Sequence, residues 1–124
     1  MSESVEPIGV EHVVLLRVKE EASLKEIDDF ENATRSLTKI PGVESVTVGR
    51  TFAESWMDDR RGGYTHALRV YLKSKEDLLV YQDHPFHVDV KKKFIIPIVD
   101  SKSSGAIPPI LAIDWESHIT LSDK

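Results

Sequence analysis

The chain contains no cysteine, which excludes disulfide bonds and thiolate chemistry and fits a reducing compartment. No apolar run approaches the roughly 20 residues that a membrane-spanning helix needs. No glycine-rich loop indicates phosphate binding, and no Ser-His-Asp or Cys-His pattern indicates a nucleophilic enzyme. The chain has fewer basic than acidic residues, with 16 Lys and Arg and 21 Asp and Glu, which gives a net charge of −5. That balance argues against nucleic acid or an anionic membrane as a partner.

What remains is the composition of an ordinary globular protein, with 40% hydrophobic and 30% charged residues in 124. That length predicts one domain, which we place at residues 8–116 between a flexible tail (1–7) and a polar tail (117–124). The N-terminal tail is acidic and polar, unlike a signal peptide. We therefore expect a soluble, cytoplasmic protein. The basic run Lys91-Lys92-Lys93 is interpreted as a solvated helix face rather than as an anion site.

Alternating apolar residues predict four strands, at 10–19, 43–49, 64–73 and 110–115. The first is apolar on both faces and so is predicted to be a central strand. Between the second and third strands lies a charged, glycine-ended loop that carries Trp56, which would act as a lid or as an anchor for another chain.

Capping signals predict the helices. Ser23 and Glu26 form a capping box ahead of an apolar stripe that ends at Pro41-Gly42, and Ser74 begins a second helix in the same way. Pro85 breaks that helix but suits the first position of a new segment, which we expect to start at residue 83 or 84 and run towards Ile98.

The order strand, helix, strand, strand, helix, strand is typical of the α+β, ferredoxin-like βαββαβ fold. It predicts a four-stranded antiparallel sheet with both helices on one face. The other face also carries apolar side chains, and a face-to-face homodimer would cover it. Within the sheet, His12 and His66 are expected on neighbouring central strands that run parallel. An imidazole in an apolar setting needs a hydrogen-bond partner or a cavity, and with His84 and His87 four histidines could converge on one cavity.

Four segments resemble the stress-responsive A/B barrel (Dabb) family over residues 8–116. They are Glu11–Arg17, Ile40–Val43, Gly63–Ala67 and Tyr81–His87, the last with its His-Pro-x-His turn. The resemblance implies a homodimer whose two sheets enclose a barrel. One branch of this family, plant olivetolic acid cyclase, closes a linear polyketide by an aldol step without metal or organic cofactor.

Carried over residue by residue, the resemblance implies a catalytic pair, Tyr81 and His87. It also implies two pocket histidines, His12 and His66, while Thr34 stands where the cyclase has a pocket-wall tyrosine. A histidine with a pKa near its ordinary value of about 6.5 can remove an acidic α-proton. A tyrosine hydroxyl can stabilise the resulting oxyanion. His87 is therefore the expected base and Tyr81 its partner.

The His-Pro-x-His turn has two other interpretations. It could be structural, with His84 capping backbone N–H groups and His87 bonded to a strand carbonyl. It could also bind a metal through His84 and His87, with Asp83 or Asp89 nearby. If there is no metal, His84 is expected to contact substrate. Because the spacing fixes no third ligand, we expect neither metal nor cofactor.

The function predicted from these residues is binding of a small apolar or aromatic molecule in the barrel cavity of a homodimer. Its enzymatic version is cofactor-free acid–base chemistry such as polyketide aldol cyclisation. Two alternatives stay open: a non-enzymatic, stress-related structural protein, and a cofactor-free enzyme of the monooxygenase type.

Overall fold

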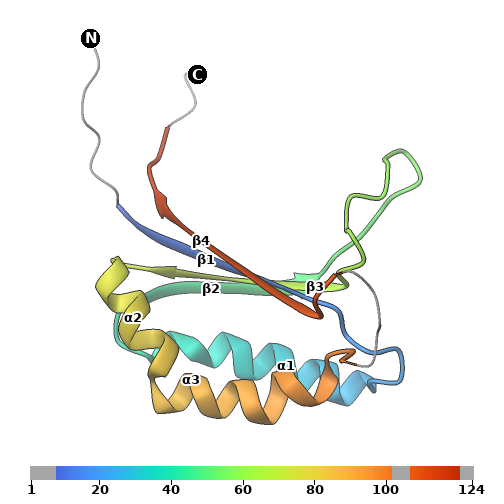
Figure 1. Cartoon of the computed structure of the whole chain (residues 1–124), viewed down its shortest axis with the longest axis horizontal. Helices are drawn as coiled ribbons and strands as arrows, with labels where there is room; N and C mark the ends of the chain where they lie inside the picture. Colours follow the sequence, from blue (N-terminus) through green and yellow to red (C-terminus); the bar gives the residue numbers. More distant parts are fainter. Residues whose placement is uncertain (1–7, 102–106, 121–124) are drawn as a thin grey trace.

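The computed structural model describes residues 8–101 and 107–120, which form a four-stranded antiparallel sheet with helices on one face (Figure 1). The strands are β1 (Gly9–Leu16), β2 (Val43–Arg50), β3 (His66–Leu72) and β4 (Ile110–Ser117), in the spatial order β2-β3-β1-β4. The α+β, ferredoxin-like fold expected from the sequence is confirmed. The tail predicted at 1–7 and the last residues of the tail predicted at 117–124 lie outside the described residues.

The prediction that the two central strands run parallel was wrong. β1 pairs with β3 in antiparallel register, with His12 opposite Val70 and Leu16 opposite His66. The reason is topological. The crossover through the first helix makes β1 and β2 point the same way, and β3 returns from β2 to lie between them, so it opposes both. His66 therefore lies at one end of the shared ladder, whereas His12 lies near its middle.

The helices begin where the capping signals place them. α1 (Leu24–Arg35) starts at the predicted capping box, in which the Ser23 hydroxyl accepts from the Glu26 N–H and the Glu26 carboxylate accepts from the Ser23 N–H. A short 3₁₀ turn (Ser36–Lys39) follows. α2 (Lys75–Asp83) is capped by Ser74, and α3 (Pro85–Val90) begins at the proline and continues as π and 3₁₀ turns to Ile98. No helix in the described ranges is long and apolar enough to cross a membrane.

The hydrophobic core fills the space between the helices and the face of the sheet that they cover. Its most completely buried side chains are Tyr81, Phe30, Leu16, Leu37, Ile40, Leu72, Val70 and Thr34. Along β1 and β3 these belong to the even-numbered set, because alternate residues of a strand point to the same face. Burial of this set stabilises the fold and fixes the face on which His12 and His66 lie.

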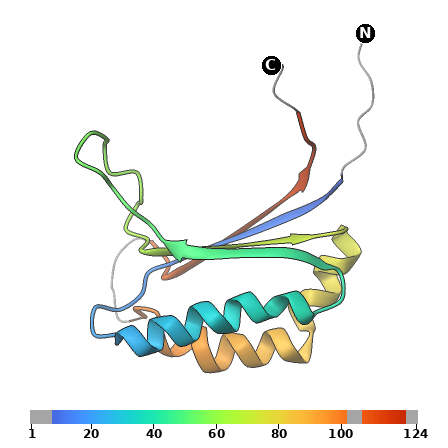
Figure 2. The ribbon, with the colours of Figure 1, turned by 180° about the vertical axis from the view of Figure 1, so that it is seen from behind.

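The opposite face of the sheet is open. It carries the odd-numbered residues of β1, β3 and β4, and on β4 the side chains of Ile113 and Trp115 are 50% and 49% exposed. A bidentate ion pair between Glu11 and Arg69 lies on the same face. The segment between β2 and β3 rises on this side, away from the helices (Figures 1 and 2), and its Trp56 is 76% exposed.

Candidate functional site

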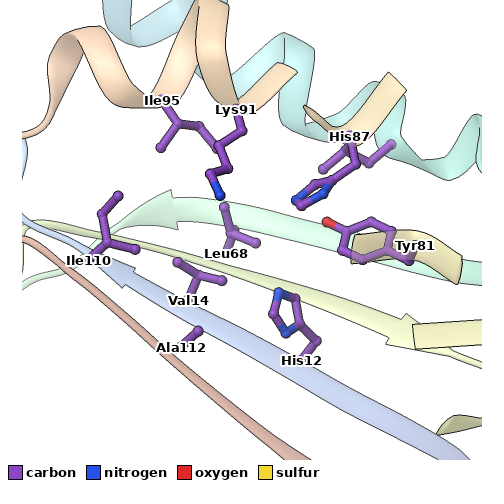
Figure 3. Close-up of a pocket in the computed structure, with 10 residues that line it drawn as sticks. His12, Val14, Leu68, Tyr81, His87, Lys91, Ile95, Ile110 and Ala112 are labelled. Carbon is purple, nitrogen blue, oxygen red and sulfur yellow. The ribbon is translucent and has the colours of Figure 1, made fainter. Parts of the chain in front are cut away.

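A cavity of about 200 Å³ lies between the sheet and the helices (Figure 3). Side chains from β1, β3 and β4 form its floor, and side chains from α2 and from the helical stretch that begins with α3 form its roof. The lining residues are His12, Val14, Leu37, Leu68, Tyr81, His87, Lys91, Ile95, Ile110 and Ala112. Most of these residues are aliphatic, and the polar ones are His12, Tyr81, His87 and Lys91.

Tyr81 and His87 meet in this cavity because the chain breaks between α2 and α3. α2 ends at Asp83 and Pro85 starts a new helix, which brings the His87 ring to 4.3 Å from the Tyr81 ring, centroid to centroid, with the planes 32° apart. The His12 ring approaches Tyr81 from β1 with a centroid distance of 5.7 Å. Figure 3 shows the Tyr81 hydroxyl and a ring nitrogen of each histidine directed into the same space.

The hydrogen bond made by His87 defines which of its nitrogens can act as a base. Nδ1 lies 3.1 Å from the backbone carbonyl of Gln82. A carbonyl oxygen only accepts, so Nδ1 carries the proton and Nε2 of the neutral ring keeps its lone pair. Burial lowers the pKa of His87, the Gln82 carbonyl partly opposes this, and the charge of Lys91 lowers the pKa further. The ring is therefore neutral near pH 7 and able to accept a proton.

The Tyr81 hydroxyl is suited to donate a proton in a hydrogen bond, whereas His87 is suited to accept one. Its side chain is 1% exposed, and burial raises the pKa of the hydroxyl well above its ordinary value. Removal from water disfavours the phenolate, so the group stays protonated and available as a donor. A neutral base, His87, and a neutral hydrogen-bond donor, Tyr81, thus lie side by side in the cavity.

Asp114 is a site residue that the sequence analysis missed. Its carboxylate bonds His12 Nδ1, and because a carboxylate accepts, this fixes the tautomer with Nε2 free. Asp114 lies opposite His12 in the β1–β4 ladder, so only the strand register brings the two together. Lys91 also lines the cavity, although the run 91–93 was interpreted as a solvated face and all three lysines are exposed. It follows His87 by four residues and so lies on the same helical side.

The other predicted site residues are absent from the cavity lining. His66 is buried near Arg50, with Nδ1 2.8 Å from the Thr65 hydroxyl, at the far end of the ladder from His12. The Thr34 hydroxyl donates to the Phe30 carbonyl at 2.8 Å within the core. His84 caps α3 by accepting the Phe86 N–H, as the structural interpretation of the turn expected. Each of the three side chains is thus bonded within its own part of the fold, outside the lining of this cavity.

Among residues 8–101 and 107–120, no three histidine, aspartate or glutamate side chains gather as a metal-binding group would require. His84 and His87 do not act as a pair, since the first caps α3 through Nδ1 and the second bonds Gln82. The cavity itself combines two imidazoles, a phenol and an ammonium group with aliphatic walls.

Acid is expected to destabilise the protein through its buried histidines. Burial, followed by the charge of Arg50, lowers the pKa of His66, and burial lowers that of His87. The unfolded chain then binds more protons than the folded one below about pH 6.5, so stability falls as pH decreases from there. Urea unfolding at pH 7.5 and 5.5 measures the loss, which should be smaller in His66→Gln. Equal losses in the parent and His66→Gln would contradict this account. Exposed His118→Gln is the control.

The sequence of the chain matches a known protein family. The family model "Stress responsive A/B Barrel Domain" matches residues 10–117. A stress-response A/B barrel domain-containing protein of Arabidopsis thaliana is 31% identical over 106 residues, which cover 86% of this chain. The match takes up 36% of the Arabidopsis protein, so the chain spans about a third of that relative.

Solved structures share the fold. A hydroxynitrile lyase from Passiflora edulis superposes with a TM-score of 0.76 at 24% identity, covering 94% of this chain and 100% of that one. A dimeric ferredoxin-like protein of unknown function from Thermobifida fusca gives 0.68 at 20% identity, covering 94% and 97%. Identities this low establish the fold, and a fold alone does not establish an activity. With the match of its sequence over residues 10–117, the chain belongs to the stress-responsive A/B barrel (Dabb) domain family.

Proposed function

We propose that the cavity binds a small apolar or aromatic molecule and carries out cofactor-free acid–base chemistry on it, such as an aldol cyclisation. The observation that supports this most strongly is the convergence of one phenol and two imidazoles on an otherwise aliphatic cavity. Binding sites commonly combine apolar walls with a few convergent polar groups. The volume of about 200 Å³ is below the common range of about 300–1,000 Å³, which favours a small ligand.

In the proposed reaction His87 Nε2 removes a proton from a carbon next to a carbonyl group. The Tyr81 hydroxyl donates to that carbonyl oxygen as it gains negative charge, which lowers the energy of the enolate. Attack of the enolate carbon on a second carbonyl forms the new C–C bond and an alkoxide. Protonation of the alkoxide by His87 closes the cycle and restores the neutral imidazole.

His12 and Asp114 form a second acid–base element on the opposite wall. Asp114 holds Nδ1–H of His12, so Nε2 is left for the cavity. A carboxylate on one ring nitrogen also stabilises the imidazolium that forms when the other accepts a proton. We assign Asp114 as the positioning residue of His12. The hydroxynitrile lyase of the same fold supports, by analogy alone, an enzymatic activity on this scaffold.

We also propose that the protein acts as a homodimer. The open face of the sheet carries exposed Ile113 and Trp115, which a second copy would remove from water. A structural neighbour with this fold is described as dimeric. The same assembly would serve the non-enzymatic alternative, in which stability of the dimer is itself the function, but that alternative gives no role to the groups in the cavity.

Filling the cavity is expected to prevent binding. Ala112→Trp places an indole ring where the ligand would lie, since Ala112 lines the cavity from β4. We expect the affinity for free indole, a small apolar aromatic probe, to fall at least about tenfold, as measured by NMR shift changes of cavity methyl groups. Ala53→Trp, in the segment between β2 and β3, is the matched control. If the parent chain does not bind indole, or if Ala112→Trp binds it as well as the parent, the ligand-binding proposal is wrong.

A further inference from the structure

Lys91 gives the cavity a positive charge that the reaction described above does not use. Figure 3 shows its amino group extending into the cavity between Ile95 and His87. The position follows from the helix, because Lys91 lies four residues after His87 and both side chains line the same space. Lys91 is nevertheless an exposed residue, so its charge lies where the cavity meets solvent.

Neighbouring side chains do not neutralise this charge. In the described part of the chain no carboxylate lies within ion-pair distance of Lys91, whereas Lys93, two residues away, pairs with Asp89 at 3.3 Å. The carboxylate of Asp114 is already bonded to His12. The remaining walls are provided by residues such as Val14, Leu68 and Ile110, which cannot accept a hydrogen bond from an ammonium group.

We propose that Lys91 recognises an anion and that the natural ligand of the cavity is a small carboxylic acid with an apolar or aromatic body. This rests on the proposed function, because it names the class of molecule that the same cavity binds. The ammonium group attracts a carboxylate, and the aliphatic side chains beside it strengthen that attraction relative to bulk water. A phosphate fits less well, since phosphate sites gather several donors and this cavity offers one cation.

This assignment also orients the ligand. Lys91 and His87 lie one helical turn apart, so a carboxylate held at Lys91 places the adjoining carbons within reach of His87 and Tyr81. The apolar body then lies against the aliphatic side chains of β4 and of the helical stretch after α3. Lys91 thus acts as a specificity determinant, while His87 and Tyr81 perform the chemistry.

Paired probes test the inference. Benzoate and benzamide have nearly the same shape but differ in charge, and calorimetry measures the affinity of each. We expect the parent to bind benzoate about tenfold more tightly than benzamide, and Lys91→Gln to lose that preference while binding benzamide unchanged. Lys93→Gln, which removes a paired lysine outside the cavity, should behave like the parent. Benzoate should also raise the pKa of His87 in the complex, because it offsets the nearby lysine charge.

Each other outcome is decisive. Equal affinity for the two probes in the parent overturns the acid assignment and leaves an apolar binding cavity intact. Equal loss of both probes in Lys91→Gln shows that the lysine maintains the cavity and does not select an anion. Binding of indole without binding of benzoate also overturns the acid assignment. Failure of indole, benzoate and benzamide together removes the proposed function itself and this inference with it.

Discussion

A glutamate in place of Ile113 is expected to convert the proposed dimer into a monomer of 14.0 kDa at micromolar concentration. Ile113 lies on the open face of the sheet and is 50% exposed in the single chain. In a face-to-face dimer both copies of the residue would be covered. Two carboxylates would then lose water without gaining a partner, at a cost of at least about 2 kcal/mol each. The dimer should weaken roughly a thousandfold, since each 1.4 kcal/mol changes an equilibrium constant tenfold.

The chain offers a closely matched control. Ile96 is 47% exposed but lies in the 3₁₀ turn after α3, on the helical side of the molecule. Ile96→Glu adds the same charge to a surface that the proposed dimer leaves in water, so it should sediment like the parent. Analytical ultracentrifugation distinguishes the outcomes. A parent chain that sediments as a monomer, or an Ile113→Glu variant that stays dimeric, would show that the open face is not the interface.

Sequence patterns predicted the fold well because they are local. The Ser23 capping box, the proline at the first position of α3 and the alternation along β3 each act within a few residues, and the structure has all of them. Strand direction is different, because it depends on how a crossover and a return connect distant strands. The incorrect parallel assignment of β1 and β3 arose there, although the element order itself requires the antiparallel arrangement.

The site shows the same division between local and long-range information. Tyr81, His87 and His12, inferred by resemblance, do lie together, but His66 lies apart from them, at one end of the ladder between β1 and β3. Asp114 could not be linked to His12 from sequence, because their contact depends on the register of β4. Lys91 was hidden within a run of three lysines, where only the direction of each side chain separates a cavity residue from solvated ones.

Replacing His87 with glutamine is expected to lower general-base catalysis in the cavity about a hundredfold. A probe that needs only a base can measure this without knowledge of the natural substrate. In 5-nitrobenzisoxazole, removal of the ring C–H proton breaks the N–O bond and releases 2-cyano-4-nitrophenolate, which is coloured. His87 Nε2 would accept the proton, and the Tyr81 hydroxyl could donate to the departing phenolate oxygen. Glutamine keeps hydrogen-bonding capacity at this position but cannot accept a proton.

The pH dependence gives a second, independent signature. Burial lowers the pKa of His87, so kcat/KM should be level above about pH 7 and decline in acid with a midpoint below about 6.5. Below that midpoint the ring is protonated and has no lone pair to offer. In His87→Gln the residual rate should lack this midpoint, and exposed His118→Gln should retain both the rate and the profile of the parent. If His87→Gln keeps the parent's rate, or if the parent's midpoint lies above 6.5, another group is the base. His12, which Asp114 holds with Nε2 free, would then be the residue to replace.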